Sequence, residues 1–258
     1  MNILVFDIET VPDVEAGRRL YRLDLPDLDV ARVMALKRRE ESGQDFLRHY
    51  LHKVVAISVL LRRGDECRIW SIGDESSSEA DLIRRFFDGI DKFSPTLVSW
   101  NGGGFDLPVL HYRALLHKIP GARYWETGED DPAFRFNNYL SRYHARHTDV
   151  MDVLAGYQAR AVAPLDQIAS FLGFPGKQGH GGAEVWERFC QGELAGIRAY
   201  CETDVINTYL VYLRLEQMRG HLSLVEHEHE EERLKAVLRE SGQPYLHAFL
   251  AAWEGGNP

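Results

Sequence analysis

Carboxylate side chains occur at three separate places in the sequence where the surrounding residues would hold them in fixed positions. They are Asp7, Glu9, Asp106 and Asp204, and Tyr200 stands four residues before the last of them. Carboxylate oxygens are the ligands that hard divalent cations such as Mg²⁺ and Mn²⁺ prefer. If folding brings these groups together, bound cations could activate a water molecule, and the phenol of Tyr200 could orient it or help to deprotonate it.

The first pair of carboxylates follows a short apolar run near the N-terminus. Residues Asn2 to Phe6 are too few for an ordinary helix and predict a buried strand. Asp7 and Glu9 are two residues apart, so on a strand their side chains lie on the same face and can reach one metal ion. Burial of both would be costly without protonation, an ionic partner or a cation. The alternative is that the strand has ended and both carboxylates are solvated.

The second carboxylate, Asp106, follows a strand expected at Thr96 to Trp100 and the loop Asn101 to Phe105. Three consecutive glycines in this loop favour unusual backbone angles or the close approach of another group, for which a terminal nucleotide is a candidate. The alternative is an ordinary flexible loop. Asp106 would then stand in the first turn of a helix expected to reach His117, where the helix dipole favours an acidic residue.

The third group lies in the longest helical stretch of the sequence, Gly192 to Met218. Tyr200 and Asp204 are four residues apart, so on a helix the phenol and the carboxylate share one face. Asp204 could supply a further metal ligand, with Tyr200 beside the bound water. The alternative is a core tyrosine near a surface aspartate.

The rest of the pattern predicts one α/β domain whose strands position these side chains. Two strand-like runs, residues 54–61 and 67–72, flank a turn at 62–65 and predict a hairpin that joins the first strand in an antiparallel meander. A fifth strand with its exit is expected at 148–154. Helices are expected over residues 78–87, 106–117, 164–172, 192–218, 226–238 and 244–253.

Two segments do not fit the sheet and are expected to be insertions. Residues 12–50 are charged with loosely helical apolar spacing, and residues 121–144 are irregular. We therefore expect one domain over residues 1–220, with a C-terminal helical extension over 221–258 packed on it. The His-Glu-His-Glu run at 227–230 has metal-binding residue types, but alternate residues on a helix do not converge, so we expect a solvated face there.

The three acidic motifs occur in the order that characterises a known superfamily. Asp-x-Glu on a first strand, Asn-x-x-x-Phe-Asp after a later strand and Tyr-x-x-x-Asp in a late helix are the motifs of the DEDD exonucleases. The sequence resembles the tyrosine branch, because Tyr200 is present while Ala199 occupies the position of the other branch's histidine. The closest resemblance is to stand-alone proteins similar to the exonuclease domain of family B DNA polymerases, and residues 164–177 also resemble that group.

This resemblance implies a ribonuclease H-like fold: a mixed five-stranded sheet flanked by helices, with the acidic cluster at one end. It implies that Asp7, Glu9, Asp106 and Asp204 hold two divalent cations, Mg²⁺ or Mn²⁺, while Tyr200 positions the attacking water. The implied reaction is 3′-5′ hydrolysis of a nucleic-acid strand, single-stranded DNA first, with release of nucleoside 5′-monophosphates. Candidate substrate-binding residues are Thr10, Asn101, Phe105 and Lys177.

The same motifs leave two other functions open. A 3′-5′ exoribonuclease would use the same acidic constellation, and a non-catalytic nucleic-acid-binding protein could retain the fold. Asp149 and Asp152 flank the fifth expected strand and are not assigned as ligands. The length leaves no room for a polymerase domain, so we expect the protein either to act alone or to work with replication or repair proteins as partners.

The composition narrows the mode of nucleic-acid binding. The formal net charge is −9, from 39 acidic and 30 basic residues, which argues against a broad basic surface. Metal ions can still attract phosphates locally, so we expect short engagement of a strand end. Three scattered cysteines indicate neither a disulfide framework nor a zinc site, and no apolar stretch approaches membrane-spanning length. These features favour a soluble cytoplasmic protein.

Overall fold

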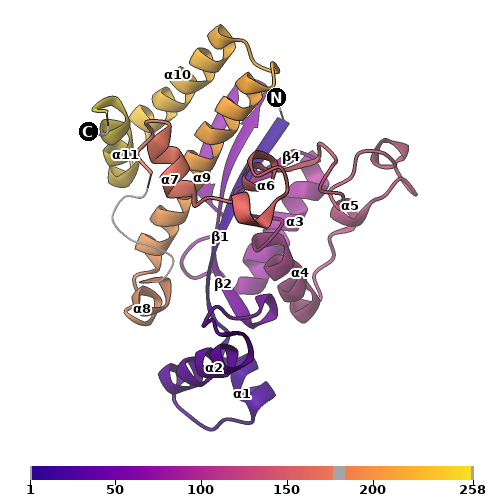
Figure 1. Ribbon diagram of the computed structural model, residues 1–258, viewed down its shortest axis with the longest axis vertical. Coiled ribbons are helices and arrows are strands. Elements are labelled where there is room, and N and C mark those ends of the chain that lie inside the picture. The colour runs from indigo at the N-terminus through magenta and orange to yellow at the C-terminus, as the bar shows by residue number, and fades with distance from the viewer. Residues whose placement is uncertain (1, 177–183, 257–258) are drawn as a thin grey trace.

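A five-stranded mixed sheet forms the centre of the protein, as the computed structural model shows for residues 2–176 and 184–256 (Figure 1). The strand order is β3-β2-β1-β4-β5. Strands β1 (Asn2–Pro12), β2 (His52–Arg63) and β3 (Glu66–Ser71) are antiparallel neighbours, whereas β4 (Thr96–Ser99) and β5 (His147–Asp149) continue the sheet in parallel. The expected meander and the mixed α/β sheet flanked by helices are therefore confirmed.

The central strand β1 is longer than the sequence indicated. It continues through Asp7 and Glu9 to Pro12, because β2 pairs with it along its whole length. The expectation of a strand that ends at Phe6 was therefore wrong. Backbone pairing with a long neighbouring strand keeps the chain extended even where the apolar run has stopped. Both carboxylates thus lie within a sheet strand and not in a solvated turn.

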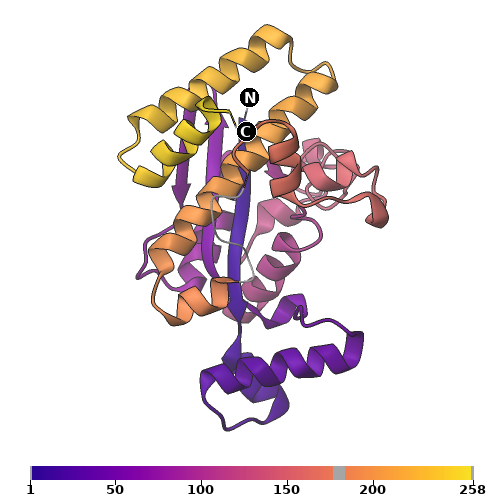
Figure 2. The same cartoon turned by 60° about the vertical axis from the view of Figure 1, so that its left-hand side comes forward.

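Alternate side chains of β1 face two different hydrophobic cores. Ile3 and Val5 pack in the core under α9 (Leu194–Met218), α10 (Leu224–Glu240) and α11 (Pro244–Glu254). Leu4, Phe6 and Ile8 pack in the opposite core, against α3 (Glu79–Phe93) and α4 (Asp106–His117). Because side chains alternate along a strand, Asp7 and Glu9 continue the row of Ile3 and Val5 toward α9. Figure 2 shows α9 crossing that face of the sheet.

The region after β4 forms shorter elements than the expected ones. The fifth strand was expected over 148–154, but β5 spans only three residues and is followed at once by α6 (Val150–Leu154). The side chain of Asp149 accepts a hydrogen bond from the backbone N–H of Asp152 and so starts the helix. The remaining elements here are η3 (Ala159–Ala161), α7 (Leu165–Phe171) and α8 (Val185–Cys190).

The first insertion forms a helical unit that projects from one end of the sheet (Figure 1). It contains α1 (Val14–Tyr21) and α2 (Asp27–Ser42), followed by η1 (His49–Leu51). Val30, Met34, Leu47 and Leu51 form its own small core. Met34 lies so close to Gly17 that a Cβ there would meet its sulfur at 2.5 Å, which explains a glycine within α1.

The second insertion is irregular but well packed. It holds α5 (Ala122–Trp125) and η2 (Pro132–Phe134), and Tyr124 stacks on Tyr139 with ring centroids 5.6 Å apart. The Arg146 guanidinium lies over the Phe134 ring, 3.6 Å from its centroid. Aromatic packing therefore replaces regular secondary structure in holding this segment beside the sheet.

The C-terminal helices pack on the same sheet through a buried ion pair. Arg62 on β2 donates two hydrogen bonds to Glu230 on α10, at 2.5 and 2.6 Å, and the Tyr209 hydroxyl donates a third at 3.0 Å. His227, one turn earlier, is 1% exposed. The expectation of a solvated His-Glu-His-Glu face was therefore wrong for His227 and Glu230 but correct for Glu228 and His229, which are exposed. A partner 168 residues away in sequence compensates the buried carboxylate of Glu230.

Among the residues that the structure describes, no helix has the length and apolar character needed to cross a bilayer.

Removal of the Glu230 carboxylate should destabilise the fold strongly. Glu230→Ala leaves Arg62 buried without its partner, which typically costs about 3–5 kcal/mol. Urea denaturation followed by circular dichroism measures this loss. Glu232→Ala on the same helix is the matched control, since the exposed pair of Glu232 with Lys235 should contribute at most about 1 kcal/mol. Similar losses in both variants would contradict a special role for the buried pair.

Protonation of His147 should contribute to acid destabilisation. Burial lowers the pKa of His147 to about 4, against about 6.5 for an unfolded histidine. The unfolded state therefore binds one proton more between these values, and stability present above pH 6.5 is lost as the pH falls toward 4. In His147→Gln, the pH dependence of the unfolding free energy between pH 6.5 and 4.5 should be shallower by up to about 1.4 kcal/mol per pH unit. Equal slopes in both proteins, measured by urea titration, would exclude this contribution.

Candidate active site

The acidic side chains of β1 lie against the middle of α9. Glu9 is 7% exposed and Asp7 is partly buried. Asp7 stands opposite Ser58 in the β1–β2 pairing, and that small buried neighbour leaves room for α9 to approach the strand. The two carboxylates therefore point into the space between the sheet and the helix.

Asp106 reaches the same region from the other side of the sheet end. It is the first residue of α4 and is 4% exposed. Its Oδ1 accepts a hydrogen bond of 3.1 Å from the backbone N–H of Ile8, which lies between Asp7 and Glu9. β4 pairs with β1 only as far as Val5, so the Ile8 N–H has no partner on β4. The Asp106 carboxylate provides the hydrogen-bond acceptor for this N–H. The bond fixes the start of α4 beside the two carboxylates of β1.

The helix α9 brings Tyr200 and Asp204 to the cluster. The Tyr200 hydroxyl is hydrogen-bonded to Asp204, and Asp204 and Glu9 both act on it electrostatically. Arg198 closes the helix onto the end of β3, since its guanidinium donates to the carbonyls of Ser71 and Gly73 at 3.2 and 2.8 Å. The residues expected to converge from three motifs are thus brought together, whereas their catalytic roles stay predictions.

Cys201 is a neighbour of the cluster that the sequence reasoning did not single out. Its thiol is fully buried and lies 3.4 Å from Oδ2 of Asp7. Potential ligand atoms of Asp7, Glu9 and Cys201 all lie within 4.8 Å of one another. The spacing from Cys201 to Asp204, three residues on one helix, is the signal that could have placed both on one face.

Burial, with added repulsion between neighbouring carboxylates at Asp7, raises the pKa values of two acidic groups in the site. Burial raises the pKa of Asp7 well above its usual value, and Asp106, Glu9 and Asp204 raise it further. Burial raises the pKa of Asp106 to about 7, although hydrogen bonds from its own backbone N–H and from that of Ile8 act in the opposite direction. A buried cluster of like charges is costly, and divalent cations are the compensation best matched to oxygen ligands.

Burial also raises the pKa of Tyr200, and the neighbouring Asp204 and Glu9 add to the effect. The phenol therefore keeps its proton over the physiological pH range. A protonated tyrosine acts as a hydrogen-bond donor and acceptor that orients water and does not act as a base.

The glycine-rich loop is shaped by the protein's own side chains. A Cβ at Gly102 would meet Ser99 Oγ at 2.3 Å, and one at Gly104 would meet the Asn101 side chain at 2.4 Å. The left-handed backbone angle falls on Asn101, with φ 63°, and not on the glycines. The glycines at 102 and 104 thus allow close packing of the protein's own side chains. A bound nucleotide is not needed to explain why glycine occurs at these positions.

Asp149 holds this loop in position. Its carboxylate accepts hydrogen bonds from the backbone N–H groups of Asn101 and Gly103, at 2.9 and 2.8 Å. Asp152 forms an ion pair with Arg142 at 2.6 Å. Asp149 is therefore an organiser of the segment that precedes Asp106, which explains a buried carboxylate at the end of β5 without a metal.

Three of the four expected substrate-binding residues lie in the described segments that carry the acidic cluster, and the roles of all four stay predictions. Thr10 follows Glu9, and its hydroxyl lies 2.9 Å from Nδ1 of His52. Phe105 precedes Asp106 and makes an edge contact with the His52 ring, at a centroid distance of 5.1 Å. Asn101 begins the loop described above, and Lys177 lies outside the described residues.

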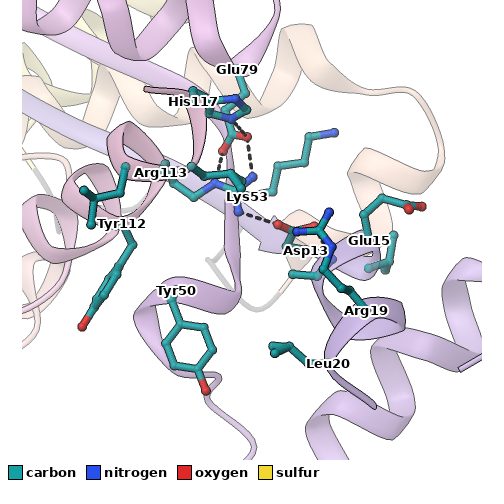
Figure 3. Close-up of a pocket in the computed structure, with 14 residues that line it drawn as sticks. Asp13, Glu15, Arg19, Leu20, Tyr50, Lys53, Glu79, Tyr112, Arg113 and His117 are labelled. Carbon is teal, nitrogen blue, oxygen red and sulfur yellow. Dashed lines mark hydrogen bonds and ion pairs between the residues drawn. The ribbon is translucent and has the colours of Figure 1, made fainter. Parts of the chain in front are cut away.

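A separate cavity of about 650 Å³ lies between the first insertion and α4 (Figure 3). Its polar wall is a buried ion network in which Arg113 pairs with Asp13 and with Glu79, and His117 lies 2.8 Å from Glu79. None of the four clustered carboxylates lines it. The network joins the end of β1 to α3 and α4, so its evident role is to attach the insertion.

The sheet order, the helices on both faces and the carboxylates around the central strand together define an α/β domain of the ribonuclease H-like class. The chain belongs to the family of predicted 3′-5′ exonucleases related to the exonuclease domain of PolB, whose profile matches residues 44–253. That range contains Asp106, Tyr200 and Asp204, while Asp7 and Glu9 precede it. Membership in this family confirms the resemblance read from the motifs.

Family B polymerases share both sequence and fold with this chain. A DNA polymerase of Archaeoglobus fulgidus is 24% identical over 217 residues, which cover 81% of this chain and 26% of the polymerase. DNA polymerase 1 of Sulfurisphaera ohwakuensis is 42% identical over 62 residues, covering 23% of this chain and 7% of the polymerase. The family B polymerase structure from Pyrobaculum calidifontis is 19% identical with a TM-score of 0.50, covering 93% and 28% of the two chains. The chain thus spans about a quarter of the first and third of these polymerases.

Removal of one carboxylate from the cluster should stabilise the metal-free protein but weaken its binding of Mn²⁺. Without metal, Asp7→Asn should raise the melting temperature by a few degrees, as expected for about 1 kcal/mol in a chain of this size, because repulsion from the other carboxylates is relieved. Added Mn²⁺ should raise the melting temperature of the wild type but shift the variant much less.

Thermal denaturation with EDTA or with Mn²⁺ measures both effects. Asp88→Asn is the matched control, since Asp88 is exposed on α3, and it should behave like the wild type in both conditions. An Mn²⁺ shift in Asp7→Asn as large as in the wild type would exclude Asp7 as a ligand.

Proposed function

We propose that this protein is a 3′-5′ exonuclease that hydrolyses the terminal phosphodiester bond of a single DNA strand and releases nucleoside 5′-monophosphates. The observation that carries the proposal is the convergence of Asp7, Glu9, Asp106 and Asp204 from three distant segments into one electrostatic cluster. Membership in a family of predicted 3′-5′ exonucleases supports the polarity and the reaction class.

The four carboxylates would hold two divalent cations, Mg²⁺ or Mn²⁺. The donor set fits such ions, because it offers oxygen ligands whose charged forms are disfavoured by burial and, at Asp7, also by the neighbouring carboxylates. When bound, the cations would supply charge for the scissile phosphate and would lower the pKa of a water molecule. The carboxylates would fix the positions of these charges from both sides of the sheet end, because α9 packs on β1 and Asp106, at the start of α4, accepts a hydrogen bond from the β1 backbone.

The role proposed for Tyr200 is to orient the attacking water. Its hydroxyl stays protonated and is hydrogen-bonded to Asp204, which fixes the direction of its oxygen. In the reaction, the water oxygen forms a bond to phosphorus while the bond from phosphorus to the 3′ oxygen of the preceding nucleotide breaks. The shortened strand then keeps a 3′ hydroxyl, and the released nucleotide keeps the 5′ phosphate.

Substrate contacts would come from the residues that border the cluster. Thr10 and Phe105 adjoin Glu9 and Asp106 in sequence, so a nucleotide whose phosphate lies at the carboxylates would contact them. Asn101 would act through the loop, and Lys177 would contact phosphate as a point charge.

DNA is the proposed substrate because the similar proteins are DNA polymerases. The same likeness supports replication or repair proteins as partners. The acidic composition supports short engagement of a strand end in place of a long basic track.

Digestion of 3′- and 5′-labelled strands tests this function. With Mg²⁺ or Mn²⁺, the wild type should shorten single-stranded DNA from its 3′ end, and EDTA should abolish the activity. Asp204→Asn should lower kcat by roughly 10³-fold or more, because it removes a charge that would hold the cations and alters the partner of the Tyr200 hydroxyl, whereas Asp88→Asn should retain full activity. Matched RNA strands, duplexes and blocked 3′ ends complete the panel. A preference for RNA strands would show that RNA, and not DNA, is the substrate. Undiminished digestion by Asp204→Asn would reject the proposed role of the acidic cluster in catalysis.

A further inference from the structure

The segment that leads from the first insertion into β2 lies against the loop that carries Phe105. His49 donates a hydrogen bond from Nε2 to the carbonyl oxygen of Gly104 at 2.9 Å. His52 contacts the Phe105 ring edge-on and is hydrogen-bonded to Thr10. The insertion is thus joined to both neighbours of the acidic cluster, the residue after Glu9 and the residue before Asp106.

Phe46 is the exposed member of this aromatic group. Its ring centroid lies 5.4 Å from that of Phe105 and 5.2 Å from that of His52, yet its side chain is 57% exposed. The next residue, Leu47, is 7% exposed and belongs to the core of the insertion. The core of the insertion therefore anchors the backbone here and leaves the Phe46 ring at the surface.

The Phe46 ring is also held in place. Arg38 Nε donates a hydrogen bond of 2.9 Å to the Phe46 carbonyl oxygen, and the two ring contacts fix the side chain from one side. An exposed aromatic ring that is already ordered loses little conformational entropy when a flat ligand stacks on it. The position therefore has the properties of a preformed contact surface.

The chemistry of the group favours a nucleobase over a phosphate. Burial lowers the pKa of His52 to about 4, so this imidazole is neutral at physiological pH. Two phenylalanine rings offer π-faces without charge, and stacking of a base on aromatic side chains is a general mode of single-strand binding. Phosphate would instead be attracted to the cations expected at the carboxylates.

We propose that Phe46 stacks on a nucleobase at the 3′ end of the bound strand, so that the first insertion supplies one wall of the substrate site together with Phe105. This inference rests on the proposed function, since it assigns the insertion to the same strand end. It gives the 12–50 insertion a role in holding the substrate base. This insertion lies outside the three acidic motifs.

A strand with an abasic 3′-terminal nucleotide separates base contact from a structural role. Phe46→Ala should lower kcat/KM on an ordinary single strand by about tenfold or more, consistent with the contribution of one stacked base. On the abasic-ended strand the same variant should match the wild type. Phe46→Trp should restore the ordinary activity, because it keeps a flat π-face.

Phe136→Ala is the matched control. Phe136 is a phenylalanine of still greater exposure, 84%, between η2 and β5, and its replacement should change neither substrate's kcat/KM. Melting temperatures of all variants show whether the fold is intact. Equal losses on both strands, or no loss on either, would overturn the base contact. The second of these results would leave Phe46 as a surface for a protein partner.

Failure of the proposed exonuclease activity is distinguishable from failure of this inference. If the wild type digests no strand, calorimetry in Mn²⁺ with dAMP and with 2-deoxyribose 5-phosphate still compares ligands with and without a base. Phe46→Ala should weaken binding of dAMP by about tenfold and leave binding of the sugar phosphate unchanged. Equal weakening of both ligands, or unchanged binding of dAMP, would reject the role of Phe46.

Discussion

Repulsion between buried carboxylates is the constraint on which the site depends. Asp7 and Glu9 follow Ile3 and Val5 on the same face of the central strand. The row therefore begins with two apolar side chains in the hydrophobic core and ends with two carboxylates. Asp106 and Asp204 add two further carboxylates from other elements. A fold that holds four such groups in place must compensate the cost elsewhere, through its two cores and through whatever cations the site binds.

Hydrogen bonds to backbone groups hold the parts of this site in register. Asp106 satisfies the N–H of Ile8, and Asp149 satisfies two N–H groups of the glycine-rich loop. Each carboxylate thereby fixes the strand or loop that carries another functional residue. For Asp149, this role explains a buried acidic residue near the site that is not proposed as a metal ligand.

The insertions differ from the common sheet in how they are stabilised. The first has a small core of its own and is attached through the Arg113 network and through the aromatic group at Phe105. The second relies on stacked aromatic rings and arginine. The first lies beside the acidic cluster through the contact of Phe46 with Phe105, whereas the second packs at the start of β4, where the Tyr139 hydroxyl donates a hydrogen bond to the carbonyl oxygen of Pro95.

Local patterns in the sequence predicted the strands and their meander, because alternation and helical spacing act over a few residues. The convergence of the side chains was expected from the order of the three motifs and their resemblance to the DEDD exonucleases. Local patterns could not give the length of β1, since pairing with β2 decides where that strand ends. They also missed the burial of Glu230 and the proximity of Phe46 to Phe105, since the partners are 168 and 59 positions away and only packing selects them. The sequence by itself determined which groups could do chemistry. The tertiary structure decided which neighbours surround them, because burial and long-range contact are properties of the folded chain.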